Sequence, residues 1–259
     1  MGVRGICKVR NEAHIISDTL DNWGEICDQG IHVYDDNSTD CTVQLCQEHL
    51  AVAEVITSDC FDPDRERAEW YCRSTVLRSA RRFMQPEDWV VYFDADEHVE
   101  EFDTTLLERS DLNVISLMSF DVYVTEEDKD ISEWHYKERR YVSPEFQIQP
   151  YFYRNSLPMD FVLPDQRNLQ YSLPDTEAHL TGKVRHWGKG LSTKKWDEKC
   201  AYYAYIFGPK YAEKWRARMG QAVHEVSDFG NPLVLWDDIL SGAIEPMWTR
   251  VQAEGVPVT

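Results

Sequence analysis

Short apolar runs alternate with amphipathic stretches along the first hundred residues of the chain. The apolar runs are bounded by glycine and small polar residues, and they predict strands over residues 3–9, 30–34, 53–57 and 89–93. The stretches between them have the length and spacing of helices. Alternating strands and helices are typical of a parallel sheet with crossover helices, so we expect an α/β fold.

The clearest helix is expected over residues 66–83. Its apolar side chains fall on one face, formed by Ala68, Cys72, Val76, Ala80 and Phe83. Acidic residues at its start and three arginines at its end suit the helix dipole. A second helix is expected after residue 11, where the side chain of Asn11 could cap it.

The alternation becomes less regular after residue 94. Further strands are expected over residues 114–124, 146–154 and 183–187, with an exposed charged loop over residues 125–140. Helices are expected from residue 193 and over residues 211–226, before a tail interrupted by prolines. The chain is therefore predicted to form one α/β domain over residues 1–192, with a helical extension over residues 193–259 packed on it.

The net charge is strongly negative, because 46 Asp and Glu face 27 Lys and Arg, a formal charge of −19. A field of that sign repels phosphate backbones, so nucleic acid is not expected as a partner. No apolar run reaches the roughly 18 residues that a transmembrane helix needs. We expect a soluble, cytoplasmic protein with no integral membrane segment. The seven cysteines include no C-x-x-C pair and are expected to be reduced and mostly buried.

Two aspartates, Asp94 and Asp96, follow the apolar run of residues 89–93. The carboxyl end of a buried parallel strand opens on the crevice where α/β sheets bind ligands. The two side chains would share a face if the strand continued through them. Neighbouring carboxylates repel each other unless a cation lies between them, and Mg²⁺ or Mn²⁺ accept oxygen ligands. The pattern predicts a divalent metal site, while capping of a loop is the structural alternative.

Four short motifs stand in a fixed order around this site. They are Lys8–Glu12 at the end of the first strand, Asp35–Asp40 at the end of the second, Arg73 on the predicted helix, and Asp94–Glu97. In order and spacing they resemble family 2 glycosyltransferases with the GT-A fold. Residues 151–155 and 184–188 resemble late strands of the same family, so the likeness extends to about residue 200. The resemblance implies a mostly parallel central sheet flanked by helices.

The resemblance also implies an activity. Members of the family move a sugar from a nucleotide-diphosphate sugar to a hydroxyl acceptor such as a glycan or polysaccharide, so a metal-dependent, hexosyltransferase-like enzyme acting with inversion is expected. Mn²⁺ or Mg²⁺ would neutralise the departing diphosphate as a Lewis acid. By resemblance Asp96 is the main metal ligand, Asp94 lies at the donor ribose or the metal, and His186 is a further ligand. Lys189, Lys194 and Lys195 follow His186 and could attract the diphosphate.

Other donor-binding residues are expected by the same likeness. Arg10 and Glu12 belong to the first motif. Asp36, with Asp35 before it, lies where relatives bind the nucleoside, although both could instead cap a helix. Arg73 matches an arginine that approaches the donor base or phosphate, with a solvated helix face as the alternative.

A general base must take the proton of the acceptor hydroxyl in an inverting transfer. Asp165 stands nearest the position at which the family places this carboxylate, and we predict it as the base. Glu145 and Asp160 are the reserve candidates.

Other protein classes share parts of this pattern. A haloacid-dehalogenase-type phosphatase would have Thr or Val two residues after the second aspartate, where this chain has His98. A nucleotidyltransferase normally carries a glycine-rich loop after its first strand, and residues 9–13 contain no glycine. A nucleotidyltransferase-like protein and a non-catalytic glycan-binding protein on the same fold are the alternatives to a glycosyltransferase.

Overall fold

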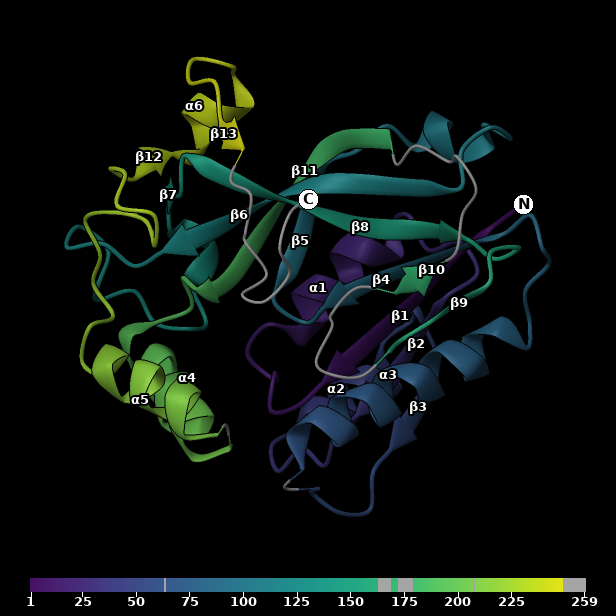
Figure 1. The fold of residues 1–259 in the computed structure, drawn as a ribbon, viewed down its shortest axis with the longest axis horizontal. Helices are drawn as coiled ribbons and strands as arrows, with labels where there is room; N and C mark the ends of the chain where they lie inside the picture. Colours follow the sequence, from purple (N-terminus) through teal and green to yellow (C-terminus); the bar gives the residue numbers. More distant parts are fainter. Residues whose placement is uncertain (63, 163–168, 172–178, 207, 249–259) are drawn as a thin grey trace.

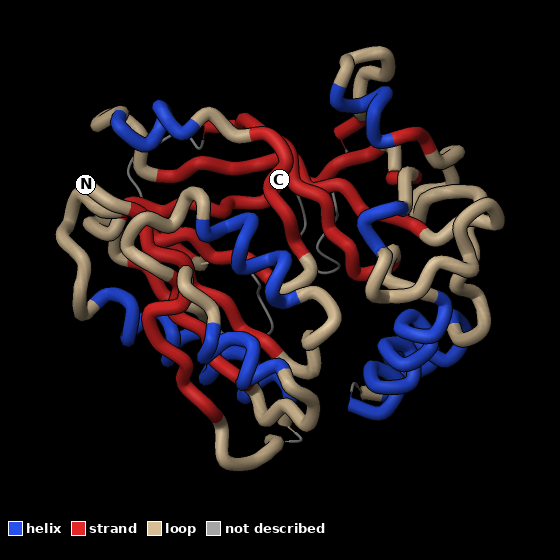
Figure 2. The backbone as a smooth tube through the Cα atoms, turned by 180° about the vertical axis from the view of Figure 1, so that it is seen from behind, coloured by secondary structure: helices blue, strands red, loops and turns tan. Residues whose placement is uncertain are grey.

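A computed structural model of the chain describes residues 1–62, 64–162, 169–171, 179–206 and 208–248 (Figure 1). Its centre is a mixed sheet with the strand order β12-β7-β6-β8-β4-β1-β2-β3. Helices lie on both sides of this sheet when the molecule is seen from behind (Figure 2). The α/β fold class with a central sheet flanked by helices is therefore confirmed.

One half of the sheet is parallel. Its strands are β1 (Val3–Val9), β2 (Ile31–Asp35), β3 (Val52–Thr57) and β4 (Trp89–Asp94). β1 pairs in parallel with β2 and β4, and β2 with β3. The crossovers contain α1 (Ile16–Gly24), α2 (Thr42–Glu48) and α3 (Arg65–Arg81). All four strands consequently end at one edge of the sheet, where the motifs of the sequence lie.

The other half of the sheet is mixed. β8 (Glu145–Arg154) runs antiparallel to β4 and to β6 (Val114–Tyr123). β11 (His179–Lys189) pairs in parallel with β6 and antiparallel with β5 (Glu97–Glu101). This arrangement brings the turn between β4 and β5 beside β11, since His186 is in register with Glu97.

Shorter elements complete the fold. They are the 3-10 helices η1 (Thr104–Glu108) and η2 (Tyr136–Glu138) and the strands β7 (Tyr141–Val142), β9 (Met159–Asp160) and β10 (Gln170–Tyr171). Residues 193–248 contain α4 (Thr193–Ile206), α5 (Pro209–Arg218), β12 (Val234–Leu235), α6 (Trp236–Leu240) and β13 (Met247–Trp248). Since β12 pairs with β7 and β13 with β8, this segment is less helical than expected and adds strands beside those of residues 1–192.

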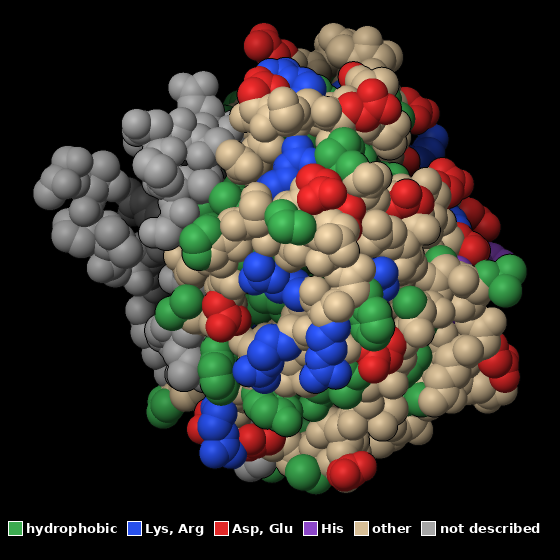
Figure 3. Space-filling model, turned by 90° about the vertical axis from the view of Figure 1, so that its right-hand side faces the viewer, with side chains coloured by type: hydrophobic (Ala, Val, Ile, Leu, Met, Phe, Trp, Pro, Cys, Tyr) green, Lys and Arg blue, Asp and Glu red, His purple; other side chains and the backbone are tan. Residues whose placement is uncertain are grey.

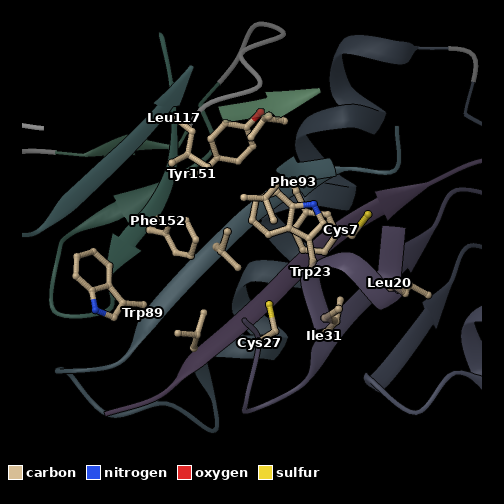
Figure 4. Close-up of a cluster of buried hydrophobic side chains, with 14 of the residues drawn as sticks. Cys7, Leu20, Trp23, Cys27, Ile31, Trp89, Phe93, Leu117, Tyr151 and Phe152 are labelled. Atoms are coloured by element: carbon tan, nitrogen blue, oxygen red, sulfur yellow. The ribbon is translucent and has the colours of Figure 1, made fainter. Parts of the chain in front are cut away.

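Two apolar clusters lie on opposite faces of the parallel strands. One contains α1 and α2 residues with Cys7 and Phe93, and the other contains α3 residues with Ile6 and Tyr92. Alternation along β1 and β4 sends neighbouring side chains to opposite faces. In the first cluster the Trp23 ring stacks on Phe93 with ring centroids 4.7 Å apart, and its Nε1–H donates to the Glu97 carbonyl at 2.8 Å (Figure 4).

Several local expectations are wrong. Asn11 does not cap α1: its φ is 56°, and the helix starts at Ile16. Phe83 is 62% exposed, because α3 ends at Arg81 before its face reaches that residue. The second C-terminal helix stops at Arg218, two residues before Gly220 with φ 73°. By contrast, the exposed loop expected over residues 125–140 is confirmed, although it buries Thr125, Tyr136 and Arg139.

Charge is unevenly spread despite the overall excess of acidic residues. On the face of the molecule in Figure 3, Lys and Arg side chains gather near the centre among scattered acidic ones.

Five of the seven cysteines are buried and all are free thiols, as expected. In the part of the chain that the structure describes, no helix combines the length and apolar character needed to cross a membrane.

The stacking of Trp23 gives a stability prediction. Trp23→Ala removes a fully buried ring and its hydrogen bond, and should lower the free energy of unfolding by roughly 3–5 kcal/mol in denaturant titration. Trp134→Ala is the matched control, because that ring is 64% exposed, and should change stability by about 0.5 kcal/mol or less. Equal losses in the two variants would contradict this account of the core.

Candidate functional site

The loops that follow β1 and β2 are locked together at the carboxyl edge of the sheet. Asn11 and Asn37 have positive φ values of 56° and 58°, a conformation that Asn tolerates better than most residues. The backbone N–H of Asn11 donates to Ser38 Oγ at 2.9 Å, and Asn11 Oδ1 accepts from the Thr39 N–H at 2.7 Å. The loops therefore hold the neighbouring residues Arg10, Glu12 and Asp36 in place.

A network of alternating charges lies at this edge, on the side covered by α3. We call it the Lys8 network; its members are Lys8, Asp36, Glu69, Arg73, Tyr92 and Asp94. The ammonium of Lys8 is 3.3 Å from Asp36 Oδ2 and 2.5 Å from Glu69 Oε1. Arg73 contacts Glu69 Oε2 at 3.2 Å and donates through Nε to the Tyr92 hydroxyl at 2.9 Å. That hydroxyl donates to Asp94 Oδ1 at 2.6 Å.

Three predicted donor-binding residues, Asp36, Arg73 and Asp94, thus belong to one connected network. The side chain of Arg73 is only 12% exposed, so it does not lie on a solvated helix face. Burial opposes the charge of Lys8, but Glu69 and Asp36 outweigh this effect and raise its pKa. The network holds a fixed set of charges and hydrogen-bonding groups at the sheet edge.

A second group of charges surrounds the turn between β4 and β5. We call it the Asp96 cluster; its members are Asp96, Asp121, His186, Lys189 and Lys199. Asp96 Oδ2 is 3.5 Å from His186 Nε2 and 3.6 Å from the ammonium of Lys199. His186 Nδ1 is 2.6 Å from Asp121 Oδ1. The ammonium of Lys189 contacts Asp121 Oδ2 at 2.5 Å and Asp228 Oδ2 at 3.1 Å.

These contacts determine the protonation of the cluster. Burial opposes the charge of Asp96, but His186 and Lys199 outweigh it and hold the pKa of Asp96 well below its usual range. Burial likewise opposes the positive charge of His186, yet Asp96 and Asp121 raise its pKa to about 10. Since a carboxylate only accepts, His186 Nδ1 carries the proton shared with Asp121, and Nε2 faces Asp96.

The donor atoms of this cluster fit a divalent ion. Asp96 offers a carboxylate oxygen and His186 an imidazole nitrogen that a second carboxylate orients, an arrangement common around bound metals. Binding an ion through Nε2 would displace the proton there. The described residues contain no group of three or more His, Cys, Asp or Glu that could hold a metal. Asp96 and His186 would therefore hold the ion together with substrate phosphates and water, as is usual for such cations.

The expected pairing of Asp94 with Asp96 on one strand face is wrong. β4 ends at Asp94, and the chain turns at Ala95 and Asp96 before β5 begins. Asp94 contacts Tyr92 in the Lys8 network, whereas Asp96 contacts His186 and Lys199. The turn thus distributes the two carboxylates between the two groups of charges.

Arg10 and Glu12 lie beside these groups. Arg10 Nη1 donates to the carbonyl oxygens of Asp36 and Asn37, the latter at 3.0 Å, and its guanidinium lies 4.2 Å from the ring centroid of Phe61. The pKa of Glu12 is raised to about 8, mainly because the side chain is buried and also because the Asp96 carboxylate is near. Glu12 is thus close enough to the Asp96 cluster to interact with it electrostatically.

The predicted general base, Asp165, lies outside the described residues. Glu145 is buried, and its Oε1 accepts from Ser227 Oγ at 2.9 Å and from Asn231, so it ties β8 to the C-terminal segment. Asp160 is exposed on β9, and its Oδ1 accepts from the Phe161 N–H at 2.8 Å. Asp35 accepts from the Ser38 N–H at 3.0 Å, which stabilises the loop after β2.

The sequence pattern assigned no site role to Asp121 or Lys199, and none to Lys8 or Gly188 beyond their place in the first motif and in the segment of residues 184–188. Lys8 and Asp121 each interrupt an apolar strand, a signal of a buried charge with a partner. Lys199 occurs within the apolar stripe of α4 that contains Trp196 and Cys200. These charges in otherwise apolar patterns could have directed attention to the site.

Gly188 leaves room for the close packing of the Asp96 cluster. A Cβ at this position would lie 2.6 Å from Lys199 Nζ, 2.7 Å from His186 Nε2 and 3.0 Å from Asp96 Oδ2. Any side chain here would therefore displace the charged groups that meet around Asp96.

No protein-family model matches the chain. The uncharacterized proteins Rv3786c of Mycobacterium tuberculosis and Mb3815c of Mycobacterium bovis are each 30% identical over 124 residues, which cover 46% of this chain and 29% of theirs. The chain thus aligns with less than a third of the length of these relatives.

The similar solved structures include glycosyltransferases of the GT-A class. One is TarS of S. aureus, at a TM-score of 0.43 and 14% identity, over 84% of this chain and 42% of TarS. Another is mannosyl-3-phosphoglycerate synthase from Rubrobacter xylanophilus, at 0.31 and 18%, over 52% of this chain and 44% of that one. A third is glucosyl-3-phosphoglycerate synthase from Mycobacterium tuberculosis in complex with Mn²⁺, UDP and glucosyl-3-phosphoglycerate, at a TM-score of 0.30 and 17% identity, over 46% of this chain and 44% of that one.

All three TM-scores lie below 0.5. The likeness to these structures is therefore one of overall fold alone.

The packing at Gly188 can be tested directly. Gly188→Ala should separate Asp96 from His186 and weaken Mn²⁺ binding about tenfold or more in an EPR titration of free Mn²⁺. Gly208→Ala is the control, since nothing lies within 4 Å of a Cβ built there, and its Mn²⁺ affinity should match the parent protein. Unchanged Mn²⁺ affinity in Gly188→Ala would show that this contact does not shape a metal site.

Proposed function

We propose that this chain is a metal-dependent glycosyltransferase that moves a sugar from a nucleotide-diphosphate sugar to a hydroxyl acceptor, a glycan or polysaccharide, with inversion. The observation that carries the proposal is the pairing of Asp96 with His186, oriented by Asp121, at the sheet edge where α/β folds bind ligands. The Lys8 network, with Asp36 and Arg73, lies at the same edge.

Different residues would bind different parts of the nucleotide-sugar donor. Asp96 and His186 would hold Mn²⁺ or Mg²⁺, which when bound supplies Lewis-acid stabilisation to the departing diphosphate. Asp36 offers an acceptor oxygen for the nucleoside, and Arg73 offers a guanidinium for the base or a phosphate. Asp94, which is joined to Arg73 through Tyr92, would bind the ribose or support the metal.

Asp165 is proposed as the general base for the acceptor hydroxyl. The proposal is supported by its position in the sequence relative to the strand β8. Asp160 and Glu145 have other partners in the structure, the Phe161 backbone and the Ser227 hydroxyl respectively.

The metal site is tested by Asp96→Asn. The substitution keeps the size of the side chain but removes its charge, and should lower donor turnover by roughly 10²-fold or more in an assay of nucleotide-sugar hydrolysis and transfer with Mn²⁺. Asp111→Asn is the control, because that carboxylate is 64% exposed and paired with Arg109, and should be unaffected. Full activity of the parent protein in excess chelator would overturn the metal assignment.

Two further measurements distinguish the alternatives. A panel of nucleotide sugars should first be screened for thermal stabilisation of the protein. Binding without turnover would indicate a non-catalytic glycan-binding protein. Release of pyrophosphate from a nucleoside triphosphate and a sugar phosphate would indicate a nucleotidyltransferase-like enzyme.

The base assignment is tested by Asp165→Asn. A general base acts in the transition state, so transfer should fall by a factor of order 10² to 10⁴ while donor affinity stays nearly constant. Asp160→Asn, tested in parallel, should retain transfer. A large loss of donor affinity in Asp165→Asn, or a loss of transfer in Asp160→Asn alone, would place the base elsewhere.

A further inference from the structure

Lys199 brings a positive charge from the C-terminal segment into the candidate metal site. It is carried by α4, and its ammonium is 3.6 Å from Asp96 Oδ2 and donates to the Gly188 carbonyl at 3.1 Å. The ring centroid of Tyr203, one turn further along α4, is 5.9 Å from the ammonium. The side chain is 26% exposed, so the charge is partly shielded from solvent.

The position of Lys199 is unusual because Asp96 already faces another cation. Asp96 Oδ2 is the atom that both His186 Nε2 and Lys199 Nζ approach, at 3.5 Å and 3.6 Å. Gly188 has no side chain and so leaves space for these contacts, since a Cβ there would touch Asp96, His186 and Lys199. A divalent ion bound to Asp96 would lie close to the ammonium and be repelled by it.

Additional negative charge beside the metal would offset the repulsion between the metal and the Lys199 ammonium. A diphosphate placed at the metal brings two or more negative charges and hydrogen-bond acceptors for an ammonium group. With diphosphate present, the metal could keep Asp96 while the ammonium turns to a phosphate oxygen. Without diphosphate, Lys199 and the metal compete for the same carboxylate.

We propose that Lys199 is a diphosphate-binding residue that also competes with the metal for Asp96, so that metal and donor bind cooperatively. The proposal rests on the proposed function and adds a residue from the C-terminal segment to the donor site. Linkage requires the cooperativity to be reciprocal: diphosphate raises the affinity for the metal by the same factor as the metal raises the affinity for diphosphate. In this proposal Lys199 lowers metal affinity in the free protein and raises the affinity for the metal–diphosphate complex.

The experiment measures Mn²⁺ and inorganic pyrophosphate binding to the full chain and its variants. EPR of free Mn²⁺ gives the metal affinity without pyrophosphate, and calorimetry at saturating Mn²⁺ gives the pyrophosphate affinity. Lys199→Met should bind Mn²⁺ roughly three- to tenfold more tightly and pyrophosphate roughly tenfold more weakly than the parent protein. These opposite signs are the diagnostic result, because a general disruption of the site would weaken both.

Three further variants complete the test. Lys199→Arg keeps the charge and should restore most of the pyrophosphate affinity. Lys214→Met removes an exposed lysine from α5 of the same C-terminal segment and should change neither affinity. Lys199→Gln replaces Lys199→Met if thermal unfolding shows that the latter does not fold.

The role of Lys199 would be overturned if folded Lys199→Met or Lys199→Gln bound both Mn²⁺ and pyrophosphate more weakly, or showed no change in either affinity. The proposed function would stand in that case if nucleotide sugars still bound. Failure of the parent protein to bind nucleotide sugars as well as pyrophosphate would overturn the proposed function and, with it, this inference.

Discussion

The contact between Asp96 and His186 is the interaction on which the candidate site depends. It exists because β5 turns back after β4 and pairs with β11, which places His186 in register with Glu97. The Trp187 N–H also donates to the Asp96 carbonyl at 2.7 Å and fixes the turn. Residues 90 positions apart in the sequence are thereby held at 3.5 Å by backbone pairing, and their side chains need little additional ordering to bind a ligand.

The site is locally balanced in charge within a strongly acidic protein. The carboxylate of Asp96 is matched by His186 and Lys199, and that of Asp121 by His186 and Lys189. Burial strengthens these pairs because solvent does not screen them. The cations at this edge would offset the repulsion that a net charge of −19 exerts on a diphosphate.

Much of the parallel half of the fold was predictable from the sequence. The apolar run of residues 3–9 coincides with β1, and residues 89–93 fall within β4, because buried parallel strands have continuous apolar sequences. The helix expected over residues 66–83 differs from α3 by one residue at its start and two at its end. Local patterns suffice where strand and helix packing follow directly from them.

The site was only partly predictable, because it depends on contacts between distant segments. Asp96 could be identified from its place after an apolar strand, but its separation from Asp94 follows from a turn that the alternating pattern does not encode. Asp121 and Lys199 reach His186 and Asp96 only through the pairing of β6 with β11 and the position of α4. For Asp121 and Lys199 the sequence offers one indication, because each is a single charged residue within an otherwise apolar element.

The most direct test of the account is pulsed EPR of the Mn²⁺-loaded protein. A directly bound imidazole gives a ¹⁴N coupling to the metal, and the account predicts this coupling in the parent protein and its loss in His186→Ala, with Mn²⁺ still bound more weakly through Asp96. A parent spectrum without ¹⁴N coupling, or a coupling that persists in His186→Ala, would contradict the metal site.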